Sequence, residues 1–365
     1  MYMLTVHQLI PRVPTRTAAA RRGIRRRAML MLALAAVCSA RKLNQLYTAQ
    51  GELLWDGARS AGTWTALPPG VHVALQSNVS IASVQGIMEY LITHAVPFRG
   101  RAGPHALSAL KRSKAAAPPR DVAYMRITGN GVTLRKKGNG QDAEAARVEE
   151  FVKLVRREPP VSDKVTVHSY QTMYGALLTP ATRSAVHKFL EIGLGCHMSY
   201  GAGASVRIWA ELMPQAERWE AEFDEVCVEQ TRDKLVGINV VTGDQGNRTT
   251  LAGWIAKTGG SFDMIVDDGG HYNHQLMMSY TMLWPHLNPG GIYVMEDVHV
   301  GRSARFATPY GGPSDAPADF LQSIAARLLG DASPVEKGRT PPPEDVEWTL
   351  CQAQACAFGK RRTIR

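Results

Sequence analysis

The first 51 residues contain neither aspartate nor glutamate. Nine lysines and arginines precede the first acid, Glu52, and they lie between Arg12 and Lys42. When these nine are subtracted from the net charge of +10, residues 52–365 carry about +1. A nearly neutral body offers no broad basic face to a phosphate backbone, so the sequence predicts no nucleic-acid partner.

The same segment lacks an apolar run of the ~20 residues that a membrane-spanning helix needs. Its apolar run, residues 28–40, follows the basic block 21–27 and ends in small residues. This pattern is typical of a signal peptide. We therefore interpret residues 1–51 as a basic leader, cleaved or kept as a membrane tether, which favours the secretory pathway (Golgi or ER lumen, or secretion). An acid-free start rich in arginine and alanine also fits a transit peptide to a plastid or mitochondrion, and a structural helix is the third interpretation.

The sequence has five cysteines but no two Cys-x-x-Cys motifs, which disfavours a structural zinc site. Cys351 and Cys356 flank Ala353 and Gln354, and they face each other if those two residues form a hairpin turn. Their Cα atoms are then roughly 4.5 Å apart, at the short edge of disulfide geometry. We expect a disulfide there in an oxidising compartment, so its formation also tests the secretory interpretation.

Residues 52–140 are predicted to be an N-terminal accessory region of mixed structure. Residues 71–75 alternate like a strand, and residues 83–95 have the period of a helix. Residues 101–120 are rich in alanine, proline and basic side chains, which is typical of a linker. Two alternating runs around Gly129, Asn130 and Gly131 predict a hairpin. A helix over 142–158 then opens a domain that spans residues 141–365.

From about residue 186, short apolar runs alternate with helical segments. The strand candidates are HKFLEIG, then VCV or RWEAEF, INVVTG, FDMIVDD and GGIYVMED, and the helix candidates are residues 205–212, 249–256 and 274–284. This alternation predicts an α/β fold with a doubly wound parallel sheet. In such sheets, ligands bind at the carboxyl ends of the strands.

The first of these strands runs through Glu191 into a glycine-rich loop. Gly193 and Gly195 allow the backbone to approach a ligand closely, because glycine adopts conformations that other residues avoid. The spacing is not the dinucleotide G-x-G-x-x-G, so it fits a plain strand–helix turn equally well.

The ends of the second and third strands supply polar side chains for a cofactor. An acid at the second strand end would bind ribose hydroxyls, and we favour Glu222 over Glu220, with a solvated acidic turn as the alternative. In the G-D-Q turn after the third strand, Asp244 could meet an adenine amino group, and Gln245 lies beside it.

Taken in order, E-I-G-L-G, the acid after the second strand, G-D-Q, D-D-G-G-H and P-G-G-I-Y-V-M-E-D resemble the pattern of class I S-adenosylmethionine-dependent methyltransferases. More narrowly, they look like the macrocin and mycinamicin sugar O-methyltransferases and their uncharacterised eukaryotic relatives. The resemblance runs from about Val165 to the C-terminus. It implies a mostly parallel, seven-stranded, Rossmann-like sheet that binds S-adenosylmethionine. It also implies a magnesium ion on Asp268, Glu296 and Asp297, with His271 as the base. The long glycine-rich loop and the N-terminal region depart from the antibiotic enzymes and leave the acceptor open.

The chemistry of these residues agrees with a metal at the sheet edge. Three carboxylates brought together would repel, and a hard divalent cation relieves that repulsion. A hydroxyl bound to the cation becomes a better acid, and His271 could accept its proton. Asp267 is expected to lie nearer the cofactor or to cap the following turn. The alternative is that Asp267 and Asp268 cap the next helix, while Glu296 and Asp297 form a solvated strand end.

Three functions remain open at this stage. The leading hypothesis is a magnesium-assisted O-methyltransferase that acts on a hydroxyl of a sugar, glycoside or similar small molecule. The second is a catalytically silent, methyltransferase-like protein that binds a glycan or a partner. The third is a metal-independent small-molecule methyltransferase whose acids are structural. All members of the acidic cluster are present, which favours an enzyme, and the sequence leaves a homo-oligomer open.

Overall fold

The computed structural model describes residues 45–47, 53–56, 72–74, 81–94, 122–138, 142–157, 159–303, 316–335 and 337–363. The contacts divide the chain into Met1–Lys42 and Leu43–Arg365, and every described residue belongs to the second unit. The apolar run 28–40 and the linker 101–120 lie outside the described residues, so their interpretations stay predictions. In the part of the chain that the structure describes, no helix is long and apolar enough to cross a membrane.

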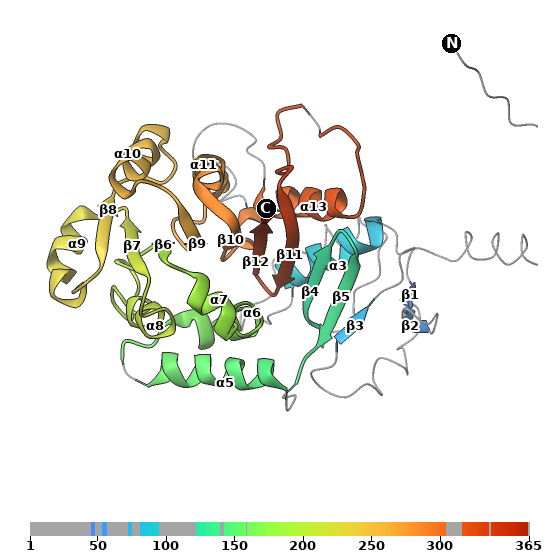
Figure 1. The fold of residues 1–365 in the computed structure, drawn as a ribbon, viewed down its shortest axis with the longest axis horizontal. Helices are drawn as coiled ribbons and strands as arrows, with labels where there is room; N and C mark the ends of the chain where they lie inside the picture. Colours follow the sequence, from blue (N-terminus) through green and yellow to red (C-terminus); the bar gives the residue numbers. More distant parts are fainter. Residues whose placement is uncertain are drawn as a thin grey trace, which may run out of the picture. The chain divides into compact units, whose positions relative to one another are not determined.

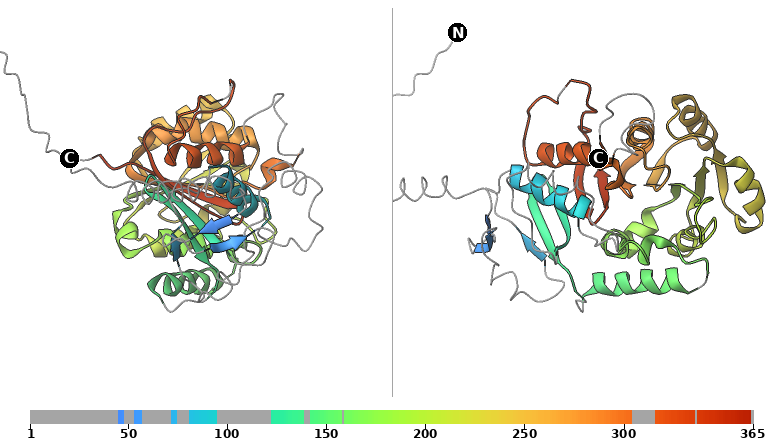
Figure 2. Two further views of the ribbon diagram at one scale, coloured as in Figure 1. Left: turned by 90° about the vertical axis from the view of Figure 1, so that its right-hand side faces the viewer. Right: turned by 180° about the vertical axis from the view of Figure 1, so that it is seen from behind.

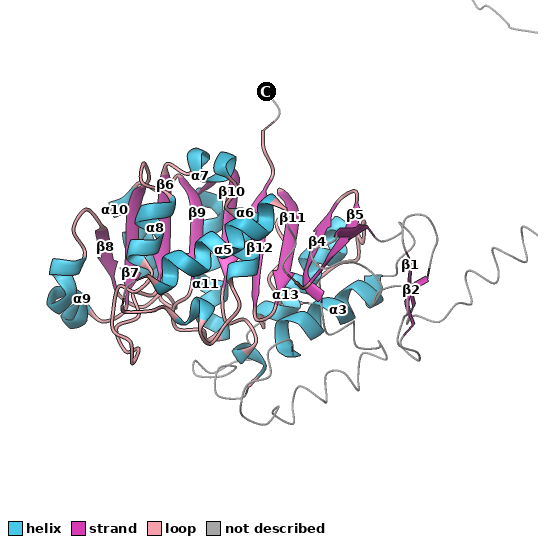
Figure 3. Ribbon diagram, turned by 90° about the horizontal axis from the view of Figure 1, so that it is seen from below, coloured by secondary structure: helices cyan, strands magenta, loops and turns pink. Residues whose placement is uncertain are grey.

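A ten-stranded mixed sheet forms the centre of this unit, in the order β3-β5-β4-β11-β12-β10-β9-β6-β7-β8 (Figures 1 and 3). Its strands are β3 (His72–Ala74), β4 (Val122–Thr128), β5 (Gly131–Lys136), β6 (Lys188–Ile192), β7 (Glu217–Glu222), β8 (Asn239–Thr242), β9 (Phe262–Asp267), β10 (Leu287–Met295), β11 (Val346–Gln352) and β12 (Ala355–Lys360). Strands β8, β7, β6, β9 and β10 are parallel, and the other pairs are antiparallel. The seven strands from β11 to β8 confirm the predicted mostly parallel, doubly wound fold.

Helices cover both faces of the sheet, and Figure 2 shows the sheet between the two layers. One face carries α3 (Ile81–His94), α10 (Arg248–Thr258), α11 (Asn273–Leu283) and α13 (Pro317–Leu328), whose buried side chains share one hydrophobic cluster. The other face carries α5 (Ala143–Arg156), α6 (Gln171–Leu177) and α8 (Val206–Leu212), which share a second cluster. The remaining helical segments are α7 (Pro180–Ala185), α9 (Glu225–Thr231) and the short 3-10 turns η1 (Asp163–Val165), η2 (Arg232–Lys234), η3 (Trp284–His286) and η4 (Val300–Arg302).

The local signals in the sequence explain where these elements begin and end. The Asp142 side chain accepts a hydrogen bond from Ala145 N and caps α5, as predicted. Asn247 caps α10 in the same way, and Gly259 ends that helix in the left-handed conformation (φ 76°). Of the two candidates for the second parallel strand, RWEAEF is correct and forms β7, whereas Cys227 lies in α9.

The region before residue 140 contributes strands to the same sheet. Strands β4 and β5 form the predicted hairpin, and β4 pairs antiparallel with β11. Strand β3 then pairs with β5 at the outer edge. A separate two-stranded sheet joins β1 (Gln45–Tyr47) to β2 (Leu53–Asp56). The described part of the accessory region therefore extends the sheet of the following domain by three strands.

Two disulfides join the four cysteines of the described residues. Cys351 and Cys356 are directly paired across β11 and β12, with Cα atoms 4.1 Å apart, which confirms the predicted hairpin bridge. Cys196 and Cys227 form a second disulfide with Cα atoms 5.9 Å apart. The sequence did not predict this bond, because it joins the glycine-rich loop after β6 to α9, across 31 residues of chain.

Candidate functional site

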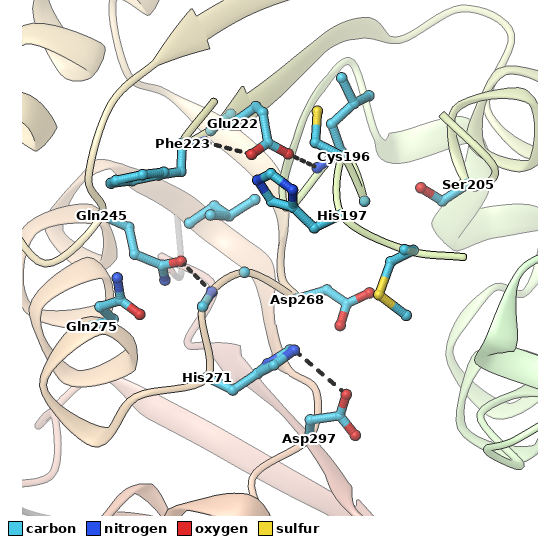
Figure 4. A pocket seen from close by; sticks show the side chains of 18 of the residues that line it. Cys196, His197, Ser205, Glu222, Phe223, Gln245, Asp268, His271, Gln275 and Asp297 are labelled. Atoms are coloured by element: carbon cyan, nitrogen blue, oxygen red, sulfur yellow. Dashed lines mark hydrogen bonds and ion pairs between the residues drawn. The ribbon is translucent and has the colours of Figure 1, made fainter. Parts of the chain in front are cut away.

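A cavity of about 400 Å³ opens where the parallel strands end. It is lined by residues that follow β6, β7, β8, β9 and β10, and by the turn η1 (Figure 4). The carboxyl ends of five parallel strands meet here, which is the usual ligand position in a doubly wound sheet. The residues predicted to bind the cofactor and the metal follow these strand ends.

The glycine-rich loop forms one wall of the cavity. Gly193 has φ 107°, and a Cβ atom at this residue would lie 2.3 Å from the backbone oxygen of Asp268. Any other residue would therefore push apart the turns that follow β6 and β9. Gly195 also has a positive φ, of 79°, and lines the cavity. The disulfide from Cys196 to Cys227 ties this wall to α9.

Glu222 reaches the cavity from the end of β7. Its carboxylate accepts hydrogen bonds from the backbone N–H groups of Leu194 (3.1 Å), Phe223 (2.8 Å) and Asp224 (3.0 Å). Glu220, its competitor in the sequence, is 1% exposed and does not line the cavity. The aromatic ring of Phe223 also lines the cavity and is 69% exposed, which the sequence did not indicate.

Gln245 is the member of the G-D-Q turn that lines the cavity. Its side-chain oxygen accepts a hydrogen bond from Gly270 N (2.9 Å), and its amide donates to Asp267 (2.9 Å). Asp244 is absent from the lining; its carboxylate accepts hydrogen bonds from Gly246 N (2.7 Å) and the Gln275 amide (3.0 Å). Asp244 therefore shapes the turn, and its expected contact with adenine stays a prediction.

Asp267 and Glu191 also lie beneath the cavity. Asp267 is fully buried and accepts hydrogen bonds from Gln245, Ser279 (2.5 Å) and Tyr293 (3.1 Å). Burial raises the pKa of Asp267 to about 6, although these donors oppose the shift. Glu191 is equally buried and accepts hydrogen bonds from the Ser205 hydroxyl and the Trp209 indole. Asp267 was expected near the cofactor or as a cap of the following turn, and Glu191 among the cofactor-binding residues. Neither lines the cavity, both hold neighbouring elements together, and their expected cofactor contacts stay predictions.

Asp268, His271 and Asp297 form a group at the far side of the cavity (Figure 4). One ligand atom from each lies within 4.8 Å of the others. The two glycines of D-D-G-G-H turn the chain so that His271 Nε2 lies 3.6 Å from Asp297 Oδ2. His271 and Asp297 both have positive φ, 58° and 51°, which non-glycine residues rarely adopt. The two carboxylates at this spacing could hold a divalent cation, with His271 beside it.

Asp297 remains a carboxylate although it is largely buried. Tyr170 donates a hydrogen bond to Asp297 Oδ1 (2.8 Å), and ring nitrogens of His168 and His299 lie 3.6 and 3.7 Å away. Burial alone would raise the pKa of Asp297, but the nearby histidines and Tyr170 outweigh it and lower the pKa.

Lys164 is the residue of this site that the sequence did not reveal. Its side chain is 1% exposed, and its Nζ atom lies 2.6 Å from Asp268 Oδ2 and 2.6 Å from Glu296 Oε2. A third carboxylate, Glu191, is 3.5 Å away. Burial opposes the charge of Lys164, but these carboxylates outweigh it and hold the Lys164 pKa well above its usual value. The cap of η1, in which Ser162 accepts a hydrogen bond from Lys164 N, helps to orient this lysine.

Glu296 was expected to be the third metal ligand, and that role stays a prediction. It is fully buried, does not line the cavity, and is bound by Lys164 and by the Tyr174 hydroxyl. Its oxygens do not belong to the group that Asp268, His271 and Asp297 form. The physical reason is that the buried Lys164 ammonium and the Tyr174 hydroxyl occupy both oxygens of this carboxylate.

Comparison with known proteins agrees with this geometry. Residues 191–298 match the family described as "Methyltransferase domain". The 8-demethyl-8-alpha-L-rhamnosyl tetracenomycin-C 2'-O-methyltransferase of Streptomyces olivaceus is 28% identical over 185 residues, which cover 50% of this chain and 47% of that protein. The demethylmacrocin O-methyltransferase of Streptomyces fradiae is 31% identical over 163 residues, which cover 42% of this chain and 38% of that protein.

The chain thus spans less than half the length of these two relatives. Among solved structures, the MycE methyltransferase from the mycinamycin biosynthetic pathway, in complex with Mg and SAH, is 23% identical; the alignment covers 62% of this chain and 55% of that one, with a TM-score of 0.47. The matched segment contains β6 to β10 and every strand end that lines the cavity. Residues 191–298 therefore match a methyltransferase domain, and this segment lies within the doubly wound part of the sheet.

Proposed function

We propose that this chain is an S-adenosylmethionine-dependent O-methyltransferase that acts on a hydroxyl of a sugar, glycoside or similar small molecule. The observation that carries the proposal is that one cavity contains both a cofactor half and a reactive half. Gly193, Glu222 and Gln245 line the cofactor half, and Asp268 and His271 line the reactive half. The matched relatives are named as O-methyltransferases, one of them of a rhamnosyl compound, which supports a hydroxyl acceptor.

The cofactor half fits the parts of S-adenosylmethionine. Glu222 stands at the end of β7, where an acid binds ribose hydroxyls in doubly wound folds. The Phe223 ring beside it offers an apolar face to the adenine. The backbone of the glycine-rich loop runs close enough to the cavity to contact the amino-acid part of the cofactor.

The reactive half fits the removal of a proton from the acceptor. His271 lines the cavity, and its Nε2 atom lies 3.6 Å from Asp297 Oδ2. The acceptor oxygen forms a bond to the sulfonium methyl carbon, the carbon–sulfur bond breaks, and the acceptor proton passes to His271. A divalent cation, when bound at Asp268 and Asp297, would make the acceptor hydroxyl more acidic. The magnesium requirement is part of this proposal.

Calorimetry with S-adenosylmethionine tests the cofactor half. We expect binding by the wild-type protein and weaker binding by Glu222→Gln, which keeps the shape of the side chain but loses its charge. Labelled S-adenosylmethionine, incubated with monosaccharides, glycosides and phenols, then tests the reaction. Binding without transfer to any acceptor would favour the catalytically silent alternative, and no binding with or without magnesium would overturn the enzyme.

We also propose that the protein works in an oxidising compartment, with the secretory pathway favoured over a plastid or mitochondrion. Support comes from the two disulfides, which pair all four cysteines of the described residues. Such bonds persist in oxidising compartments and are rare in reducing ones. Mass spectrometry of protein from its native compartment should find both bonds intact; free thiols at Cys351 and Cys356 would contradict the proposal.

A further inference from the structure

We infer that Lys164 keeps Glu296 out of the metal site, so that the divalent cation of this chain is held by two carboxylates, Asp268 and Asp297. This inference rests on the proposed function and deepens it, because it decides which side chains bind the cation. The resemblance to sugar O-methyltransferases implies three carboxylate ligands. In the structure one of the three, Glu296, binds Lys164 and Tyr174 instead.

Both oxygens of Glu296 already have partners. Lys164 Nζ lies 2.6 Å from Oε2, and the Tyr174 hydroxyl donates to Oε1. Glu296 and Tyr174 are fully buried, and Lys164 is 1% exposed. A carboxylate held from two sides inside the core cannot turn toward the cavity without breaking both contacts.

Asp268 and Asp297 are placed differently. Their side chains are 19% and 14% exposed, and both line the cavity. Lys164 binds only one oxygen of Asp268, Oδ2. The donor atoms of Asp268, Asp297 and His271 lie within 4.8 Å of one another. Each carboxylate can therefore offer an oxygen to one cation while Lys164 holds Asp268 in position.

The charge balance explains why Lys164 would retain Glu296 when a cation binds. If Glu296 moved to the cation, the buried ammonium would lose one of its two closest partners, and an under-compensated buried charge is strongly destabilising. Mg²⁺ has no need of a third carboxylate, since it is commonly bound through one or two carboxylates and keeps several waters. Two protein carboxylates leave more positions open for the acceptor, and they leave His271 available as the base.

Two isosteric variants of adjacent residues, Glu296→Gln and Asp297→Asn, separate the alternatives. Mn²⁺ is the probe, because the free ion gives an electron paramagnetic resonance signal, and the full chain is titrated in the presence of S-adenosylhomocysteine. We expect Glu296→Gln to change the Mn²⁺ dissociation constant by less than about threefold. Asp297→Asn should weaken it by more than the roughly 10–100-fold that a residue supporting a metal ligand is worth. An equal loss in both variants would overturn the inference.

A third variant keeps the test informative if Glu296→Gln fails to fold. Tyr174→Phe removes a hydrogen bond to Glu296 and leaves the charges unchanged. If Glu296 were a ligand, Tyr174 would support it, and its loss should cost about 10–100-fold in Mn²⁺ affinity; we expect no change. S-adenosylhomocysteine affinity is measured in parallel. A wild-type protein that binds S-adenosylhomocysteine but no Mn²⁺ would reject the metal site alone, whereas failure to bind either would reject the proposed function.

Discussion

His271 is the side chain on which the proposed proton transfer depends. It lies on the turn after β9 and faces Asp297 across 3.6 Å. We expect His271→Ala to lower turnover by ~10²–10⁴-fold, the usual worth of a general base. Cofactor and metal binding should persist, because the variant removes no carboxylate. Added imidazole should restore part of the rate. An unaltered rate in the variant would show that another group takes the proton.

The side chain and the backbone of Asp268 make separate contacts. Its carboxylate faces the cavity and Lys164, whereas its backbone N–H donates to Ile192 O (2.9 Å) and holds the turn. We expect Asp268→Asn to abolish metal-dependent turnover and to leave S-adenosylmethionine binding nearly intact. Calorimetry and a methyl-transfer assay on the same sample check both statements. Full activity in the presence of a chelator would remove the metal from the mechanism.

His299 gives the fold a measurable dependence on pH. Burial lowers the pKa of His299 to about 4, although Asp297 opposes the shift. The unfolded chain binds a proton at this histidine near pH 6.5, and the folded chain binds it only near pH 4. Its contribution to stability is therefore complete above pH 6.5 and is lost as the pH falls toward 4, by about 3 kcal/mol.

Urea unfolding of the wild type and of His299→Gln between pH 4 and pH 7 measures this contribution. The difference between the two free energies of unfolding should shrink as the pH falls. Comparing the two proteins is necessary, because Asp267 acts in the opposite direction. Burial raises the pKa of Asp267 to about 6, so its contribution to stability is lost as the pH rises from about 4 to 6. Parallel pH profiles would mean that His299 keeps an ordinary pKa.

At the scale of elements, the disulfide from Cys196 to Cys227 ties one wall of the cavity to α9. It connects the glycine-rich loop to α9, which follows Glu222 and Phe223 at the end of β7. We expect the double variant Cys196→Ser, Cys227→Ser to weaken S-adenosylhomocysteine binding by about three- to tenfold, because the loop must then be ordered on binding. Closing 31 residues of chain should also contribute about 3–4 kcal/mol to stability.

The second disulfide provides the matched control for this prediction. Cys351 and Cys356 are fully buried in the β11–β12 hairpin and do not line the cavity. Their double serine variant should lower stability, by about 2 kcal/mol for so short a loop, while cofactor affinity stays unchanged. Equal cofactor affinity in all three proteins would show that the loop is ordered without its bridge.

At the scale of the whole molecule, the compact unit starts near residue 43. The contacts separate Met1–Lys42 from Leu43–Arg365, and the ten-stranded sheet lies entirely in the second unit. We expect a protein that lacks residues 1–42 to keep the thermal midpoint and the cofactor affinity of the full chain. An insoluble product would indicate that the apolar run 28–40 belongs to the core.

A longer deletion, of residues 1–140, serves as the contrast. It removes β3, β4 and β5 and exposes the edge of β11, which pairs with β4 over Gln352 to Trp348. It also removes α3, whose Val84, Met88 and Leu91 pack in the core. Because an unpaired edge strand promotes aggregation, we expect this product to aggregate although it retains the matched methyltransferase segment.

Much of the parallel half of the fold could be read from local sequence. Most strands there are short apolar runs followed by glycine or an acid, and such patterns act over neighbouring residues; β7, with three acids and an arginine, is the exception. The same locality explains the Cys351–Cys356 bridge, which closes across a two-residue turn. The acids at strand ends were also identifiable, since parallel strands bring their carboxyl ends to one edge.

Tertiary structure alone decided which of those acids face the cavity and which serve the core. Lys164 lies 104 residues before Asp268 and 132 before Glu296, so no local pattern joins them. The Cys196–Cys227 bridge and the pairing of β4 with β11 are likewise non-local. The periodicity of a segment predicts whether that segment is a strand or a helix. The partner of a buried charge depends instead on which distant segments the packing brings together. For that reason the acidic cluster could be predicted from sequence, whereas its contact with Lys164 could not.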